Sequence, residues 1–251
     1  MPNSSTASRV VRRVVKGMPT SDGAGVKLRR VIGQPQLPDL DPFLMLDEFG
    51  TDRAEDYIAG FPDHPHRGFE TVTYMLDGRM RGFQLWLNLP ARDKMTAPKY
   101  QEFGPERIPV ATPAPGVSVK VIAGHVDGVS GPISQPATDP TYLDIALESG
   151  AEFTQSLPPD YAAFLYVFEG TLQVGASDGA SVLRTHELGV LGDGREIRLK
   201  GVTAGAGGKV ARAILVGGRP LREPVAKYGP FVMNTREELQ QAFEDFQRGR
   251  F

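Results

Sequence analysis

The sequence predicts an all-β fold that ends in one helix, and three observations lead to this prediction. The chain has 29 glycines and 21 prolines in 251 residues, a turn-rich composition that is expected of many short strands. Apolar and polar residues alternate in segments such as 117–123, which reads Val-Ser-Val-Lys-Val-Ile-Ala. Near the C-terminus, Thr235 and Glu238 match a capping box and precede apolar residues at helical spacing.

The first candidate strand, residues 9–16, mixes valines with arginines. A basic anchor for nucleic acid would contain the same residues, but charged side chains commonly protect an edge strand, and we favour the edge strand. Asp47 and Glu48 are adjacent carboxylates, and we interpret them as a rim or turn feature because neighbouring strand residues point to opposite faces. Further strands are expected at residues 26–32, 43–49, 70–76, 83–89, 107–110 and 117–123.

The second half of the chain predicts a separate β domain. Residues 128–140 are rich in Gly, Pro and Ser, the composition of a linker. We therefore predict two domains, residues 1–130 and residues 131–251, with the helix at the end of the second. The strands of the second domain are expected at residues 142–146, 163–168, 171–174 and 187–191.

Two of the chain's four histidines lie in the stretch Phe61-Pro62-Asp63-His64-Pro65-His66-Arg67-Gly68-Phe69-Glu70. In an extended segment His64 and His66 point to the same side, and Glu70 shares their parity unless Gly68 carries a bulge. Imidazole and carboxylate groups are the donors that non-haem Fe(II) prefers, and also Mn, Zn or Ni. The stretch is therefore either a metal site with His64 and His66 as ligands or a pair of surface-loop histidines.

The segment from His64 to Tyr74, His-Pro-His-Arg-Gly-Phe-Glu-Thr-Val-Thr-Tyr, resembles the signature of the pirin family of the cupin superfamily. The resemblance implies two tandem cupin, jelly-roll-like β-barrels and a C-terminal helix. It also implies that the second barrel is metal-free, since residues 152–155, Glu-Phe-Thr-Gln, stand where a second His-x-His would be. Further segments similar to pirins lie at residues 41–49, 82–90, 94–101, 220–224 and 229–235.

The resemblance also implies an internal deletion. Pirins have four metal ligands in the first barrel, two from the His-Pro-His motif and two from a later His-x-Glu motif. In this chain only residues 77–81 separate Leu76 from Gly82, and Asp77-Gly78 suits a hairpin turn, so the second motif and its strands are missing. Only His64 and His66 carry over as metal ligands. Glu70 matches a family glutamate that supports the ligands without touching the metal.

The functional expectation follows from this gap. Pirins resemble Fe(II)-dependent quercetin 2,3-dioxygenases, which implies Fe(II) or another divalent metal as cofactor and a flavonol-like small molecule as substrate. A catalytic metal has about three protein ligands, and Asp63, Glu70 or His125 would supply a third only by rearrangement. We therefore expect metal binding and dioxygenase activity to be weakened or lost.

Two alternatives remain open. One is a non-catalytic binding protein or co-regulator that acts through protein–protein contacts, as the resemblance also implies. The other is a degenerate chain that unfolds in part or oligomerises through the edge that the deletion opens.

Composition excludes several other functions. The formal net charge is −2 with no strongly basic domain, so we expect no direct nucleic-acid binding. The absence of cysteine excludes disulfides and thiol nucleophiles. The sequence shows no signal peptide and no apolar run of membrane-spanning length, so we expect a cytoplasmic monomer without membrane contact.

Overall fold

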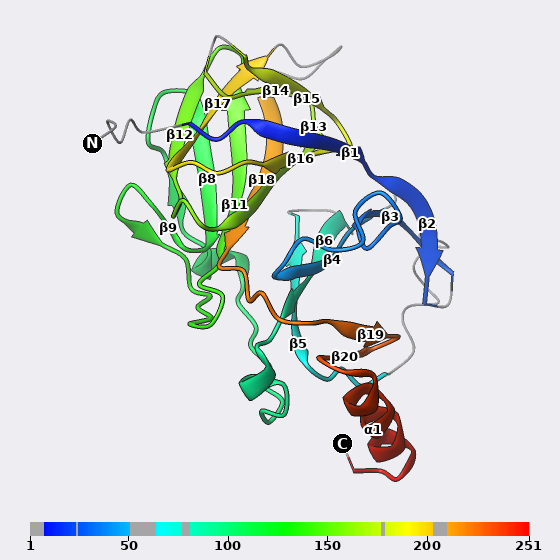
Figure 1. Ribbon diagram of the computed structural model, residues 1–251. Helices are drawn as coiled ribbons and strands as arrows, with labels where there is room; N and C mark the ends of the chain where they lie inside the picture. Colours follow the sequence, from blue (N-terminus) through cyan, green and yellow to red (C-terminus); the bar gives the residue numbers. More distant parts are fainter. Residues whose placement is uncertain are drawn as a thin grey trace, which may run out of the picture. The chain divides into compact units, whose positions relative to one another are not determined.

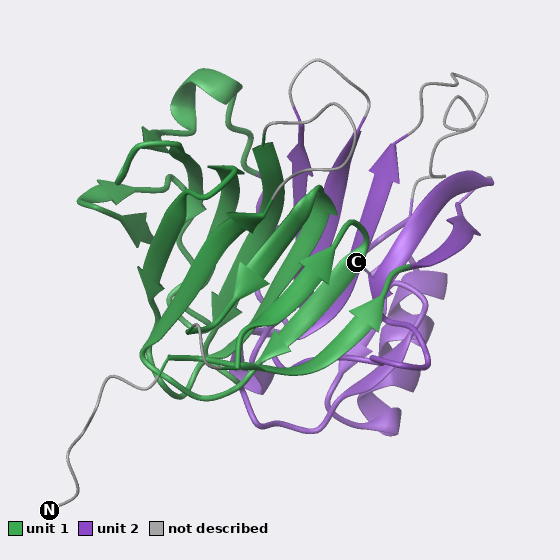
Figure 2. Cartoon of the chain, turned by 90° about the horizontal axis from the view of Figure 1, so that it is seen from above, with its two compact units in different colours: residues 1–17, 101–220 green, residues 18–100, 221–251 purple. Residues whose placement is uncertain are grey.

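A computed structural model describes residues 8–23, 25–50, 64–76, 81–176, 179–202 and 210–250. The described chain forms two compact units, drawn in different colours in Figure 2. Unit 1 comprises residues 1–17 and 101–220, and unit 2 comprises residues 18–100 and 221–251. Each unit thus takes in one end of the chain, whereas the predicted domains 1–130 and 131–251 follow chain order. The two units are defined by their internal contacts and do not test the predicted domain boundary between residues 130 and 131, which stays a prediction.

Unit 1 contains two larger antiparallel sheets and a short ribbon among its described strands. The ribbon pairs β9 (His125–Val126) with β10 (Val129–Ser130). One sheet has the strand order β12 (Glu152–Ser156), β17 (Glu196–Val202), β14 (Thr171–Val174) and β15 (Ser181–Arg184). The other has the order β1 (Val11–Lys16), β16 (Glu187–Leu191), β13 (Ala162–Glu169), β18 (Val210–Gly218), β11 (Thr141–Glu148), β8 (Val117–Ala123) and β7 (Val110–Ala111).

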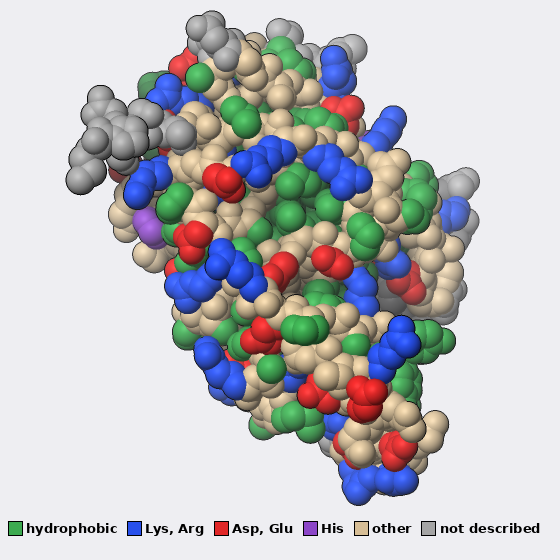
Figure 3. All heavy atoms as spheres, in the orientation of Figure 1, with side chains coloured by type: hydrophobic (Ala, Val, Ile, Leu, Met, Phe, Trp, Pro, Cys, Tyr) green, Lys and Arg blue, Asp and Glu red, His purple; other side chains and the backbone are tan. Residues whose placement is uncertain are grey.

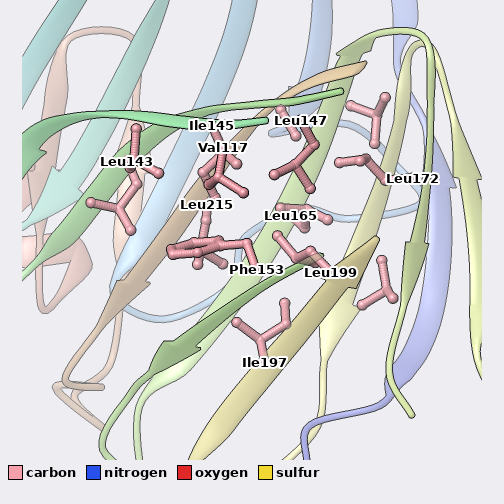
Figure 4. Close-up of a cluster of buried hydrophobic side chains, with 14 of the residues drawn as sticks. Val117, Leu143, Ile145, Leu147, Phe153, Leu165, Leu172, Ile197, Leu199 and Leu215 are labelled. Atoms are coloured by element: carbon pink, nitrogen blue, oxygen red, sulfur yellow. The ribbon is translucent and has the colours of Figure 1, made fainter. Parts of the chain in front are cut away.

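The core of unit 1 lies between these two sheets (Figure 4). Every second residue of β11 faces it, so that Leu143, Ile145 and Leu147 are completely buried. Phe153 on β12 and Leu199 on β17 close the core from the other sheet. This alternation is the period of two that half-buried strands require.

The N-terminal strand β1 is an edge strand, as the sequence predicted (Figure 1). Arg9, just before it, departs from the expected outward-facing pattern because its side chain is completely buried. Its guanidinium donates hydrogen bonds to the carbonyl oxygens of Tyr161 at 2.9 Å and Gly192 at 3.0 Å, and also to Pro158. A buried cation thus supplies hydrogen bonds to three carbonyl groups that surround it.

Unit 2 is organised around one five-stranded sheet among its described strands. Its order is β2 (Met18–Asp22), β3 (Val26–Ile32), β4 (Phe43–Gly50), β6 (Arg81–Asn88) and β5 (Phe69–Met75). The hairpin of β19 (Ala226–Tyr228) and β20 (Phe231–Met233) follows, and then helix α1 (Arg236–Gln247). Thr235 and Glu238 form the predicted capping box of this helix.

The all-β fold with a C-terminal helix is confirmed, and two details need correction. The described strands form open sheets rather than closed barrels, because each large sheet ends in two edge strands. The strand expected at residues 107–110 begins only at Val110, after a helical turn at Pro105–Arg107. The hairpin turn predicted at Asp77-Gly78 lies outside the described residues.

Asp47 and Glu48 do not mark a rim. Both lie within β4 and are buried on opposite faces, each beside an arginine of a neighbouring strand. Arg30 donates two hydrogen bonds to Asp47, at 3.0 and 2.8 Å, and Arg81 donates two to Glu48, at 3.1 and 2.6 Å. The carboxylates tolerate burial because each is paired with a guanidinium.

Surface charge follows the near-neutral composition. On the face drawn in Figure 3, basic and acidic side chains are interspersed. In the described part of the chain, no helix combines the length and the apolar character needed to cross a membrane.

Replacing Arg9 with methionine should destabilise the protein by about 3 kcal/mol, because buried carbonyl groups lose their donor. Arg12→Met is the matched control, since Arg12 forms an ion pair with Asp193 whose side chains are 61% and 82% exposed. That change should cost about 0.5 kcal/mol or less. Urea unfolding of both variants measures the difference, and equal losses would contradict the role assigned to Arg9.

Candidate functional site

The His-Pro-His motif lies immediately before β5 in unit 2, and its two imidazoles are close neighbours. Their ring centroids are 4.7 Å apart with an edge-to-face arrangement. His64 is exposed and His66 is half-buried. The Nε2 atom of His66 is buried and has no hydrogen-bond partner among the described residues.

An aromatic cluster holds the ring of His66. Its centroid lies 4.9 Å from that of Phe69 and 5.6 Å from that of Trp86. Trp86 is the only tryptophan of the chain, and it packs with Leu44, Phe69 and Val232. Burial, and then the neighbouring His64, lower the pKa of His66 below its ordinary value. His66 is therefore neutral at pH 7, the state in which an imidazole binds a metal.

Gly68 breaks the strand alternation that would have placed Glu70 beside the histidines. Its φ is +87°, and β5 begins only at the next residue. Phe69 contacts His66, whereas Glu70, as the next strand residue, points to the opposite face and pairs with Leu87. The sequence left open whether Gly68 interrupts the strand alternation, and the structure shows that it does. The supporting role of Glu70 stays a prediction.

Lys94 is a buried cation of this site. In the sequence it was noted only as part of the pirin-like segment 94–101. Its side-chain ammonium donates hydrogen bonds to Gly68 O at 2.9 Å, Asn88 Oδ1 at 2.7 Å and Val232 O at 3.2 Å. Burial lowers the pKa of Lys94 to about 8, and the charges of Glu223 and Glu238 oppose this shift. No periodicity marks a lysine in an irregular segment as buried, so the sequence carried no direct signal for it.

Two carboxylates of the same sheet, Asp22 and Asp47, are paired with one arginine. Asp22 accepts a hydrogen bond of 2.7 Å from Arg30, which also binds Asp47. Burial opposes ionisation of Asp22, but the bond from Arg30 holds its pKa below the ordinary value, with a smaller contribution from His64. Burial raises the pKa of Asp47. Both carboxylates thus belong to one ion-pair network around Arg30.

The described residues supply only some of the ligands that a divalent metal requires. The orphaned Nε2 of His66 and the adjacent imidazole of His64 are suitable donors. No group of three or more His, Cys, Asp or Glu in the described ranges is arranged to hold a metal ion. A catalytic centre needs about three protein ligands, so the described donor set does not fit a complete catalytic metal site.

The other two histidines of the chain belong to unit 1. His125 is exposed on β9 of unit 1. His186 has a φ of +68°, and its Nδ1 lies 3.4 Å from the hydroxyl oxygen of Tyr166 in the same unit. Asp63 lies outside the described residues.

Comparison with known proteins points to one family. A family model described as Pirin matches residues 25–87, and one described as the Pirin C-terminal cupin domain matches residues 142–251. A pirin-like protein of Caulobacter vibrioides is 48% identical over 284 aligned positions, which cover 97% of this chain and 99% of that protein. Pirin of Homo sapiens is 35% identical, with coverage of 97% and 94%. A solved structure of a quercetin 2,3-dioxygenase from Acinetobacter baumannii superposes with a TM-score of 0.81 at 25% identity, covering 98% of this chain and 99% of that one.

Gly68→Ala should destabilise the protein by about 3 kcal/mol. The added Cβ would overlap the carbonyl oxygen of Val232, and the φ of +87° is itself unfavourable for alanine. Gly229→Ala is the control, because Gly229 also has a positive φ, +53°, but its Cβ would meet open space. That change should cost only about 1 kcal/mol. Denaturant unfolding compares them, and similar losses would mean that the close approach to Val232 does not matter.

The depressed pKa of His66 predicts acid sensitivity. Its unfolded-state pKa is about 6.5, so the unfolded chain takes up a proton before the folded one as the pH falls. Stability should therefore be unaffected by His66 above that value and should decrease below it. Urea unfolding between about pH 7.5 and pH 5 should show a smaller decrease for His66→Gln than for the unaltered chain. A slope for His66→Gln equal to that of the unaltered chain would refute the assignment.

Proposed function

The chain belongs to the pirin family, and from this premise we propose that it is a pirin-like protein with weakened or lost metal-dependent dioxygenase activity toward flavonols. One observation carries the proposal. The imidazoles of His64 and His66 are neighbours, and the described residues contain no group of three or more His, Cys, Asp or Glu that could hold a metal ion. Binding of Fe(II) or another divalent metal would rest on these two imidazoles and would be correspondingly weak.

The length of the alignments supports an internal deletion as the cause. The alignment with the Caulobacter protein has 284 positions, more than the 251 residues of this chain. That relative therefore carries residues that this chain lacks. The short connection between Leu76 and Gly82, where pirins have a second ligand motif, is where we place the loss.

The surroundings of His66 support a flavonol-like ligand. Phe69 and Trp86 lie beside its ring, with their own centroids 4.2 Å apart. Trp86 remains half-buried, so it offers apolar aromatic surface of the kind on which a planar ring stacks. A bound divalent metal would supply a Lewis acid for the oxygens of such a ligand. The chain's own contribution is to keep His66 neutral and to orient it.

Metal content and turnover test the proposal. Protein purified without chelators should contain iron well below stoichiometric amounts, and dialysis should remove it. Iron-loaded protein should convert quercetin no faster than its His64→Ala/His66→Ala variant. His125→Ala is the matched control for loss of a histidine outside the pair. Stoichiometric iron, or quercetin turnover that His64→Ala abolishes, would refute the proposal and show that further ligands are recruited.

A protein-binding role is the second candidate, and exposed aromatic residues favour it. Tyr100 and Tyr228 of unit 2 are 86% and 71% exposed, and tyrosine is enriched at protein interfaces. This role predicts that a specific partner still binds the His64→Ala/His66→Ala variant and is released by Tyr228→Ser. Capture of chaperones and proteases alone would reject it.

A further inference from the structure

The residue that follows His66 is joined by its backbone to the C-terminal segment of the chain. Arg67 donates its N–H to Pro230 O at 3.2 Å and accepts from the N–H of Val232 at 3.0 Å. Arg67 and Phe231 thereby form a parallel bridge, which places β20 next to the start of β5 (Figure 1). Both main-chain polar groups of Arg67 are thus held by residues more than 160 positions later in the sequence.

The side chain of Arg67 reaches further along the same segment. Its guanidinium pairs with Asp245 of α1 at 2.9 Å, and the two side chains are only 11% and 16% exposed. Gln241 donates to the other oxygen of Asp245 at 2.9 Å, and Arg250 lies 3.3 Å from that oxygen. Asp245 therefore sits in a network that fixes its carboxylate. A partly buried ion pair of this kind is screened less than a surface pair.

Helix α1 is itself anchored beside β20. Phe231, Met233 and Ala242 form a buried cluster, against which Leu239 and Phe243 pack. The rings of Phe231 and Phe243 are 4.8 Å apart, edge to face. The helix thus presents Asp245 to Arg67 from a rigid base rather than from a free tail.

Lys94 adds a third connection to this arrangement. Its ammonium binds Gly68 O and Val232 O at once, so it joins the motif to β20 where the two backbones approach most closely. A cavity of about 180 Å³ within unit 2 has Arg67, Lys94 and Asp245 in its wall. The Arg67–Asp245 ion pair therefore borders this cavity, so shortening one of the two side chains does not force neighbouring residues to move.

We propose that residues 230–245 form a clamp that sets the orientation of the His66 imidazole through Arg67, with Asp245 as its positioning residue. The clamp follows from contacts around Arg67. The effect of the clamp on metal uptake rests on the proposed function. Where two imidazoles bind a metal without a third ligand, the backbone that carries them sets their orientation. A positional error of the ligand weakens metal binding by about tenfold or more, as for other residues that orient ligands.

The experiment compares three variants at two positions. Asp245→Ala removes the carboxylate, and Asp245→Glu is the conservative variant that keeps the charge. Glu48→Ala is the matched control, because it breaks another partly buried arginine–carboxylate pair of unit 2, Glu48–Arg81 at 2.6 Å. Glu48 pairs across from Phe83, on the face of the sheet opposite to Trp86, so it is remote from the His66 ring.

The first readout is the chemical shift of the His66 ring protons in metal-free protein. These protons lie beside Phe69 and Trp86, and ring currents shift their resonances. Asp245→Ala should move them toward the values of an exposed histidine. Asp245→Glu should restore them, and Glu48→Ala should leave them unchanged even at an equal loss of melting temperature. If Asp245→Ala does not fold, Asp245→Asn, which keeps the shape and removes the charge, takes its place.

The second readout is Co²⁺ uptake, followed by quenching of the fluorescence of Trp86. Asp245→Ala should weaken uptake about tenfold, and Glu48→Ala should not. Unchanged His66 resonances in Asp245→Ala, or equal shifts in Glu48→Ala, would overturn the clamp whatever the metal result. If the unaltered chain takes up no Co²⁺ while the resonances respond as expected, the proposed metal binding fails and the clamp stands.

Discussion

The close approach of Gly68 to the carbonyl of Val232 is the contact on which the site in unit 2 depends. Any side chain at Gly68 would overlap that carbonyl, so the backbone of the histidine motif and that of β20 meet without space between them. The positive φ of Gly68 then turns the chain into β5 and decides which residues face His66. One glycine thereby connects the end of the chain, the motif and the aromatic cluster of Phe69 and Trp86.

Buried cations recur wherever the chain joins distant segments. Arg9 satisfies three carbonyl groups of unit 1, and Lys94 satisfies three acceptors of unit 2. Pro158, Tyr161 and Gly192 lie outside the strands, and Gly68 lies just before β5, so most of these carbonyl groups are not part of a strand ladder. A long basic side chain solves this because it brings several donors to one point. The same logic explains the burial of Asp47, whose carboxylate binds Arg30.

The candidate site was predictable in its donors and not in its geometry. The spacing of His64 and His66 indicated two neighbouring imidazoles, and they lie 4.7 Å apart. The face of Glu70 depended on Gly68, whose left-handed conformation interrupts the alternation just before β5. Arg67, Lys94 and Asp245 were not recognisable as parts of the site, since their partners are distant in sequence and charged residues usually remain in solvent.

The sequence by itself determined the β character of the chain, the capped C-terminal helix, the edge strand at the N-terminus and the family. Each of these is a local property, expressed in the alternation of residues, in turn chemistry or in motifs that read along the chain. The tertiary structure alone decided that the described strands form open sheets and that each end of the chain joins the unit built mainly from the other half. It also decided that the His66 ring packs beside Phe69 and Trp86. These outcomes depend on pairings between distant residues, such as Arg67 with Phe231, which no local pattern encodes.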